Sequence, residues 1–483
     1  MKAQLITLVL FALAPLAASA DNHSSRVRIE EASVAQLQAA MASGRLTSEA
    51  ITREYIARIL AFDQSGPDVN SVMEINPDAI NLARQADHMR RRGKVLGPLH
   101  GIPVLLKGNI DTGDRMQTTA GSFGLAGAPA PRDSTVAARL RAGGAVILGK
   151  TNLSEWANFR SFLSTSGWSA VGGQTNNPYA INRNPCGSSS GSAAATTANF
   201  AAVSLGTETD GSIVCPGNAN GVVAIKPTVG LTSRAGVVPI SHTQDTVGPH
   251  ARSVADAAIA LSVIQSRTSD SRDPATAGVP IGWQGRARPA NIPADYTRFL
   301  DRNGLRGARL GLTRSGIESA PPQIIAAFDE VLEKLEAAGA TVIDLDAAGF
   351  VFAPAEGEFL VLAYEFRNDL RSYLATRTRV PLAGKTLTDA IAFNDANAEK
   401  EMPFFGQEIF ELANSLAPGA NDPQSEFDGM TYNQALAISR DSGVNGIDKA
   451  LADFALDAVI APTDNPAWAT DLIYGDDFIF GSS

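Results

Sequence analysis

Short apolar segments bounded by turn residues constrain the fold of this chain most strongly. The clearest are residues 101–107 (GIPVLLK), 145–148 (AVIL) and 201–205 (AAVSL), which have the length and composition of buried strands. Helix-like sequence precedes the second segment, over 134–142, and the third, from about Gly191. Wholly apolar strands that alternate with helices are typical of a sheet covered on both faces. The sequence therefore predicts an α/β fold.

The second half of the chain continues this alternation. We expect strands over 308–312 and 341–345 around a helix at 322–338, a right-handed crossover unit if the strands are parallel. Two more helices are predicted over 356–376 and 387–398, and one more buried strand over 456–463. The Pro/Gly/Arg-rich region 273–294 is predicted to be a surface excursion.

Composition limits the class of protein. The chain has 483 residues, of which 44% are hydrophobic and 19% charged, values that exclude a disordered or fibrous protein. The formal net charge of −10 argues against a nucleic-acid binder, because such proteins normally carry a basic face.

The N-terminus has the pattern of a secretory signal peptide. Lys2 precedes an apolar run over 5–16, and an Ala-x-Ala cleavage site ends at Ala20. A membrane anchor is the rival interpretation, but the run is short for spanning a bilayer. We therefore expect residues 1–20 to be removed and the chain to be periplasmic or secreted, with no membrane association after cleavage.

Residues 184–227 carry the densest group of serines and glycines in the chain. Gly187 to Gly191 matches the G-x-S-x-G pattern, which would make Ser189 a nucleophile, but that motif requires a preceding strand. The preceding residues 174–186 are polar and contain two prolines, so they do not form a central strand. No histidine follows His250 to complete a Ser-His-Asp triad, and no Gly-Lys-Ser/Thr ending supports a nucleotide-binding loop.

A lysine can replace histidine as the base that activates a serine. Lys107 ends the apolar run 101–107, where burial would lower its pKa and allow it to accept a proton. A lysine that merely extends to solvent from a strand end fits the residues equally well.

Only two cysteines occur, Cys186 and Cys215, beside the two serine-containing loops. A disulfide would require those loops to meet in an oxidising compartment. Two small, buried, unpaired residues are the favoured interpretation, although the sequence leaves the pairing of the cysteines open. Their spacing does not fit a zinc site.

The motifs GIPVLLKGN, GSSSGSAA and GTETDGSI together resemble the amidase signature family of serine hydrolases. The resemblance covers most of residues 30–480 and implies one amidase signature domain over 21–483, with the signature core at about 90–260. It implies a central mixed sheet covered by helices on both faces. It also implies a Ser–cis-Ser–Lys triad in which Ser212 is the nucleophile, Ser188 the bridging serine and Lys107 the base. The oxyanion hole would consist of the N–H groups of Thr209, Asp210, Gly211 and Ser212, and neither metal nor organic cofactor would be needed.

Within the family, the segments SEWANFR, PCGSSSGSA and GTETDGSIVCP are most similar to the bacterial peptide amidases. The similarity implies hydrolysis of the C-terminal carboxamide of peptides by a monomer. Three alternatives remain: hydrolysis of small or fatty acyl amides, a glutaminase-type component of a tRNA-dependent amidotransferase, or a truncated member that binds without turnover. Two features depart from the family: Gly108 stands where aspartate is usual, and the chain ends at Ser483, earlier than its relatives, which suggests truncation at the C-terminus.

Overall fold

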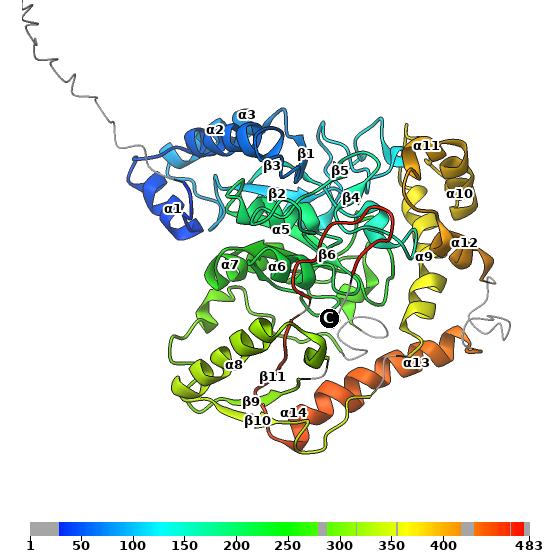
Figure 1. Ribbon diagram of the computed structural model, residues 1–483. Coiled ribbons are helices and arrows are strands. Elements are labelled where there is room, and N and C mark those ends of the chain that lie inside the picture. Colours follow the sequence, from blue (N-terminus) through cyan, green and yellow to red (C-terminus); the bar gives the residue numbers. More distant parts are fainter. Residues whose placement is uncertain are drawn as a thin grey trace, which may run out of the picture.

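The structure, a computed structural model, describes residues 29–278, 287–314, 316–353, 356–416, 429–463 and 465–477 (Figure 1). The predicted signal peptide lies outside the described residues. So do parts of the predicted surface excursion and of the C-terminal end.

A six-stranded sheet forms the centre of the molecule, in the order β1-β3-β2-β6-β8-β7. Its strands are β1 (Val72–Ile75), β2 (Pro103–Lys107), β3 (Val146–Thr151), β6 (Val203–Glu208), β7 (Val223–Ala224) and β8 (Thr246–Ala251). Strand β2 pairs in parallel with both β3 and β6, whereas β1, β7 and β8 pair antiparallel with their neighbours. The sheet is therefore mixed, as the family resemblance implied.

Every residue of β2, β3, β6 and β8 is buried, so both faces of these strands are covered. Four of the covering helices are α2 (Ser48–Arg58), α3 (Ala79–Arg91), α4 (Thr135–Ala142) and α7 (Val254–Ile264). A fifth covering helix, α5 (Ser190–Thr197), consists of serine, glycine, alanine and threonine. These small side chains allow it to pack closely on β2, β3 and β6. The predicted α/β class is confirmed.

A smaller, three-stranded sheet lies beside α8 (Figure 1). It contains β9 (Arg309–Leu312), β10 (Thr341–Asp344) and β11 (Ala458–Ile460), with both outer strands parallel to β9. Helix α8 (Pro322–Ala337) connects β9 to β10, so the predicted strand–helix–strand unit with parallel strands is confirmed. Strands β4 (Trp168–Ser169) and β5 (Gly173–Gln174) form a separate two-stranded ribbon.

A second hydrophobic core surrounds α9 (Glu358–Leu374), whose buried Phe366 and Leu370 belong to the same cluster as Phe410. The rings of Phe366 and Phe410 are in contact. The helices around it are α10 (Leu387–Ala396), α11 (Ala398–Glu401), α12 (Glu408–Ser415) and α13 (Tyr432–Ser442). Figure 1 shows α9 to α12 together on one side of the central sheet. The remaining α-helices of the described residues are α1 (Val34–Ala42), α6 (Val214–Ala219) and α14 (Lys449–Asp453). Across the described part of the chain, no helix is both long enough and apolar enough to span a bilayer.

Candidate active site

Lys107 is the last residue of β2 and is fully buried. Its Nζ lies 2.7 Å from Ser188 Oγ, 2.9 Å from Thr207 Oγ1 and 3.2 Å from the Thr207 carbonyl oxygen. Burial lowers the pKa of this amine from 10.5 to about 7, although the nearby carboxylates of Asp245 and Glu208 act in the opposite direction. Lys107 therefore does not extend to solvent, and near neutral pH a large fraction of its amine is uncharged and able to accept a proton.

Ser188 lies in the turn that leads into α5, and the Gly187–Ser188 peptide bond is cis. The carbonyl oxygen of Ser188 accepts a hydrogen bond from the N–H of Ser154 at 3.1 Å. A Cβ atom on Gly187 would lie only 2.2 Å from Ser154 Oγ and 2.8 Å from Ser166 Oγ. Only glycine fits at this position, which explains the Gly-Ser sequence of the loop.

Ser212 lies in the turn between β6 and α6 and is 7% exposed. The preceding Gly211 has a φ of 73°, a left-handed conformation that favours glycine. The Glu208 carboxylate fixes the far side of this turn, since its Oε2 accepts hydrogen bonds from the N–H groups of Ile213 (2.6 Å) and Val214 (2.9 Å).

The two serine-containing loops lie side by side. The N–H of Ser189 donates to the carbonyl oxygen of Ser212 at 3.1 Å. Cys186 and Cys215 form a disulfide across the same junction, with their Cα atoms 5.9 Å apart. The expectation of two unpaired cysteines is therefore wrong, because the loops meet and bring the two residues to bonding distance.

The other three residues expected in the oxyanion hole, Thr209, Asp210 and Gly211, occupy the same turn as Ser212. Thr209 is buried and donates a hydrogen bond from Oγ1 to Asp245 Oδ1 at 2.5 Å. Asp210 is exposed, and Gly211 is partly exposed beside it. The structure thus brings Lys107 into contact with Ser188, and places Thr209, Asp210, Gly211 and Ser212 on the loop next to Ser188.

Gly108 occupies a crowded, partly apolar position. A Cβ atom there would lie 3.1 to 3.2 Å from the Leu153 and Met73 side chains and from the carbonyl oxygen of Thr151. The neighbouring Asn109 instead contributes a polar contact, because its Nδ2 donates to Thr207 Oγ1 at 2.9 Å. Asn109 therefore orients the threonine that contacts Lys107, which the sequence did not indicate.

Three further residues around Lys107 were missed in the sequence: Thr207, Glu208 and Asp245. Thr207 and Glu208 lie within the motif GTETDGSI, close to the predicted nucleophile, so proximity in sequence was a usable signal for both. Asp245 is 36 residues from Thr209 along the chain, and only the antiparallel pairing of β8 with β6 brings the two together.

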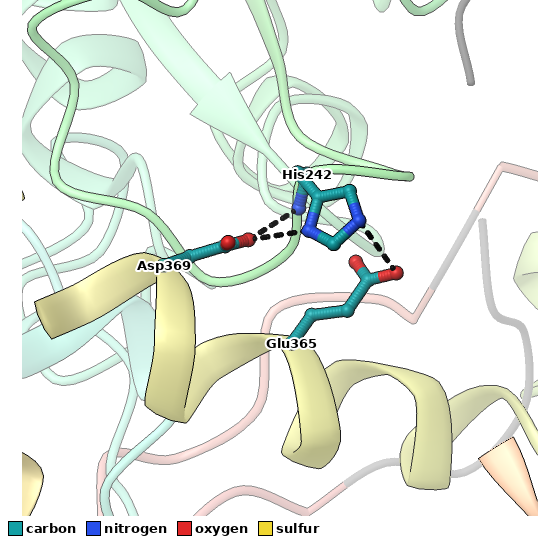
Figure 2. A group of neighbouring side chains, drawn as sticks. All are labelled: His242, Glu365 and Asp369. Carbon is teal, nitrogen blue, oxygen red and sulfur yellow. Dashed lines mark hydrogen bonds and ion pairs between the residues drawn. The ribbon is translucent and has the colours of Figure 1, made fainter. Parts of the chain in front are cut away.

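His242, Glu365 and Asp369 form the one group of potential metal ligands found among the described residues (Figure 2). The imidazole presents its two nitrogens to different carboxylates, with Nδ1 2.8 Å from Asp369 Oδ2 and Nε2 3.4 Å from Glu365 Oε1. Glu365 also accepts hydrogen bonds from Ser241, Thr243 and Tyr432. Carboxylates occupied in this way suit an ion pair with a protonated imidazole better than a metal ion.

Comparison with known proteins identifies the family. The family model described as Amidase matches residues 50–472. A probable amidase of Arabidopsis thaliana is 41% identical over 445 residues, which span 90% of this chain and 80% of that protein. One component of the glutamyl-tRNA(Gln) amidotransferase of Salinispora arenicola is 38% identical over 348 residues, 71% of this chain and 66% of that protein.

Solved structures of similar proteins support the same family assignment. The native peptide amidase of Stenotrophomonas maltophilia has a TM-score of 0.81 and 48% identity, with 91% of this chain and 85% of that chain covered. The peptide amidase PAM in complex with the competitive inhibitor chymostatin has a TM-score of 0.83 and 47% identity, with 94% and 88% covered. The chain belongs to the amidase family and is a hydrolase that acts on the C–N bond of amides.

Proposed function

We propose that this amidase hydrolyses the C-terminal carboxamide of peptides to the free carboxylic acid and ammonia. The observation that carries the mechanism is the contact between the buried Lys107 amine and the Ser188 hydroxyl, 2.7 Å apart. The support for a peptide substrate is the 47 to 48% identity with peptide amidases over more than nine-tenths of the chain.

In the proposed first step, the Ser212 hydroxyl attacks the carbonyl carbon of the amide. Its proton passes to Ser188 Oγ while the proton of Ser188 passes to the neutral Nζ of Lys107. The lowered pKa of Lys107 supports this direction of transfer, because a base with a pKa near 7 is free to accept a proton at neutral pH.

The negative charge that develops on the carbonyl oxygen is stabilised by the backbone N–H groups of residues 209–212. A single donor of this kind is worth roughly 3 kcal/mol in the transition state. The C–N bond then breaks, the departing nitrogen takes the proton back through Ser188, and ammonia leaves. Water attacks the resulting ester on Ser212 by the same proton route, which releases the acid and restores the serine.

The protein is proposed to act outside the cytoplasm as a monomer, after removal of residues 1–20. The Cys186–Cys215 disulfide supports export, because such bonds persist mainly in oxidising compartments.

Ammonia release from a panel of amides tests the proposed substrate. The panel contains C-terminally amidated di- and tripeptides, the same peptides as free acids, acetamide, a fatty acyl amide and L-glutamine. We expect ammonia from the amidated peptides and none from the matched acids, and Ser212→Ala should abolish release. Release only from the acyl amides or from glutamine would contradict peptide specificity.

Labelling with a fluorophosphonate tests the nucleophile independently of the substrate. Wild-type protein should be labelled at Ser212, and Ser212→Ala should lose the label while Ser189→Ala keeps it. A wild-type protein that takes up no label would support the alternative of binding without turnover.

A further inference from the structure

The loop 240–245 is attached along one face of α9. Ser241, His242, Thr243 and Gln244 each donate a hydrogen bond to one of three α9 carboxylates: Glu358, Glu365 and Asp369. These acidic residues are spaced seven and four residues apart, which places them on the same side of a helix. Four consecutive residues of the loop are therefore held by one helix.

His242 is the central contact of this attachment (Figure 2). Its backbone N–H also donates to Asp369 Oδ2 at 2.8 Å, so this carboxylate holds both the main chain and the ring. Burial alone would lower the pKa of His242, but Asp369 and Glu365 outweigh this effect and raise it. The imidazole is thus favoured in its charged form, in which it interacts with both carboxylates.

The opposite end of the loop contacts the proposed catalytic loop. Asp245 Oδ2 accepts the N–H groups of Ile240 (3.0 Å) and Ser241 (3.1 Å), while Oδ1 accepts the hydroxyl of Thr209. Arg234 adds a further support by donating to the carbonyl oxygen of His242 at 2.6 Å. A continuous set of hydrogen bonds therefore joins α9 to the residue that begins the proposed oxyanion hole.

We propose that Asp245 is a positioning residue for the amidase reaction, and that α9 acts through it. By holding Thr209, Asp245 fixes the backbone of residues 209–212 in the orientation that the oxyanion requires, and the attachment of His242 to α9 fixes Asp245. This inference rests on the proposed function, because it assigns a role within that same site.

The proposal has a specific kinetic consequence. Donors stabilise an oxyanion only when they are already oriented as the charge develops, so a small shift of residues 209–212 weakens the transition state more than substrate binding. Loss of the Thr209–Asp245 hydrogen bond should consequently lower kcat with little change in KM.

A double-mutant cycle tests the link. In Asp245→Asn, an amide N–H₂ group replaces one of the two carboxylate oxygens. This group cannot accept the hydrogen bonds that the oxygen received from Thr209 or from Ile240 and Ser241. In Thr209→Val, the hydroxyl is removed. We expect each single variant to lower kcat by roughly 10- to 100-fold, and the double variant to be no worse than the more impaired single variant. Asp389→Asn, which alters a similar Thr–Asp pair at the exposed start of α10, is the matched control and should leave kcat unchanged.

Asp369→Asn tests the contribution of α9 from outside the catalytic loop. We expect a smaller fall in kcat, unchanged KM and normal thermal unfolding. If Asp245→Asn does not fold, Thr209→Val and Asp369→Asn together carry the test, and kcat should fall in both.

Several outcomes would overturn the inference: wild-type kcat in Asp245→Asn, wild-type kcat in a folded Asp369→Asn, or single-variant losses that multiply in the double variant. Each can be separated from failure of the proposed function. If the wild-type protein is inactive and unlabelled, the proposed function itself is wrong. If the wild-type protein is active and the variants are unaffected, only the role proposed for Asp245 is wrong.

Discussion

Lys107 is a buried amine surrounded by hydrogen-bond acceptors. Its contacts are the hydroxyls of Ser188 and Thr207 and the carbonyl oxygen of Thr207. These acceptors can hold an ammonium ion in place, but they carry no formal charge. The cost of removing the charged ammonium from water is therefore only partly offset, and the pKa of Lys107 falls to about 7. Burial at the end of an apolar strand thus produces a base suited to neutral pH.

The pH dependence of turnover should follow from this pKa. Below pH 7 the amine is protonated and cannot accept the proton of Ser188, so kcat/KM should rise with pH by up to about tenfold per unit and level off above pH 7. Initial rates of ammonia release between pH 5 and pH 9 would measure this profile. Lys107→Ala should show no turnover anywhere in the range, and substantial activity in that variant would contradict the proposed base.

Replacing Gly108 by aspartate, the residue that the family resemblance implies at this position, should lower both the stability of this protein and its activity at neutral pH. Gly108→Asp brings a Cβ atom to 3.1 Å from Leu153 and from the Thr151 carbonyl oxygen, so neighbours must move. A carboxylate next to Lys107 would also raise the pKa of the amine and shift the rising part of the pH profile upward. We expect a lower unfolding temperature and a higher apparent pKa in kcat/KM.

Gly108→Ala separates the two effects, because it adds the Cβ atom without the charge. It should share the loss of stability and keep the wild-type pH profile. A Gly108→Asp variant that is both as stable and as active at neutral pH as wild type would argue against this account of the site.

At the residue scale, local patterns singled out Lys107 and the serine-containing loops as candidates, namely an apolar run before a lysine and glycines around serines. The catalytic roles proposed for them came from the resemblance to the amidase signature family. The pairing of Cys186 with Cys215 and the contact of Thr209 with Asp245 had no such pattern. Both depend on segments distant in sequence that meet only in the folded chain, so local reasoning was insufficient.

At the scale of elements, the loop that precedes α5 and the loop that follows β6 act as one unit. The backbone hydrogen bond from Ser189 to Ser212 and the disulfide between Cys186 and Cys215 both cross their junction. The disulfide therefore fixes the proposed nucleophile loop relative to the proposed bridging serine.

Removing the disulfide should weaken both stability and turnover. The cysteines are 29 residues apart, and closing a loop of this length stabilises a fold by about 3.6 kcal/mol in the chain-entropy description. We expect the unfolding temperature and kcat of wild-type protein to fall on addition of dithiothreitol. The double variant Cys186→Ala/Cys215→Ala should start at the lower values and not respond to dithiothreitol. An equal response of both proteins would exclude the disulfide as the cause.

Strands β2, β3 and β6 were predicted from their apolar sequence, whereas β8 was missed. Its six residues, TVGPHA, include glycine, proline and histidine, which are poor signals for a central strand. The strand nevertheless pairs antiparallel with both β6 and β7, and the carbonyl oxygen of Pro249 accepts a hydrogen bond from the N–H of Ile225. Hydrogen bonding to a strand on each side stabilises β8, although the β-propensity of its own sequence is low.

At the scale of the whole molecule, the two sheets differ in how they are protected. Strands β2, β3, β6 and β8 are buried along their full length, whereas β10 and β11 contain exposed residues at Thr341, Asp344 and Ala458. The proposed base ends β2 and the proposed oxyanion hole follows β6. The candidate catalytic groups are thus anchored to the most protected part of the chain.

Native-state hydrogen exchange should reflect this difference. Amides in β2, β3 and β6 should exchange only through global unfolding, because opening them exposes the central core. Amides in β9, β10 and β11 should exchange through a smaller opening, since fewer buried side chains oppose it. Mass spectrometry of peptic fragments at low denaturant concentration would resolve the two groups, with the bulk unfolding free energy as the reference. Equal opening free energies in both sheets would instead mean that the molecule unfolds as one cooperative unit, and that the candidate catalytic groups gain no extra protection from their position in the central sheet.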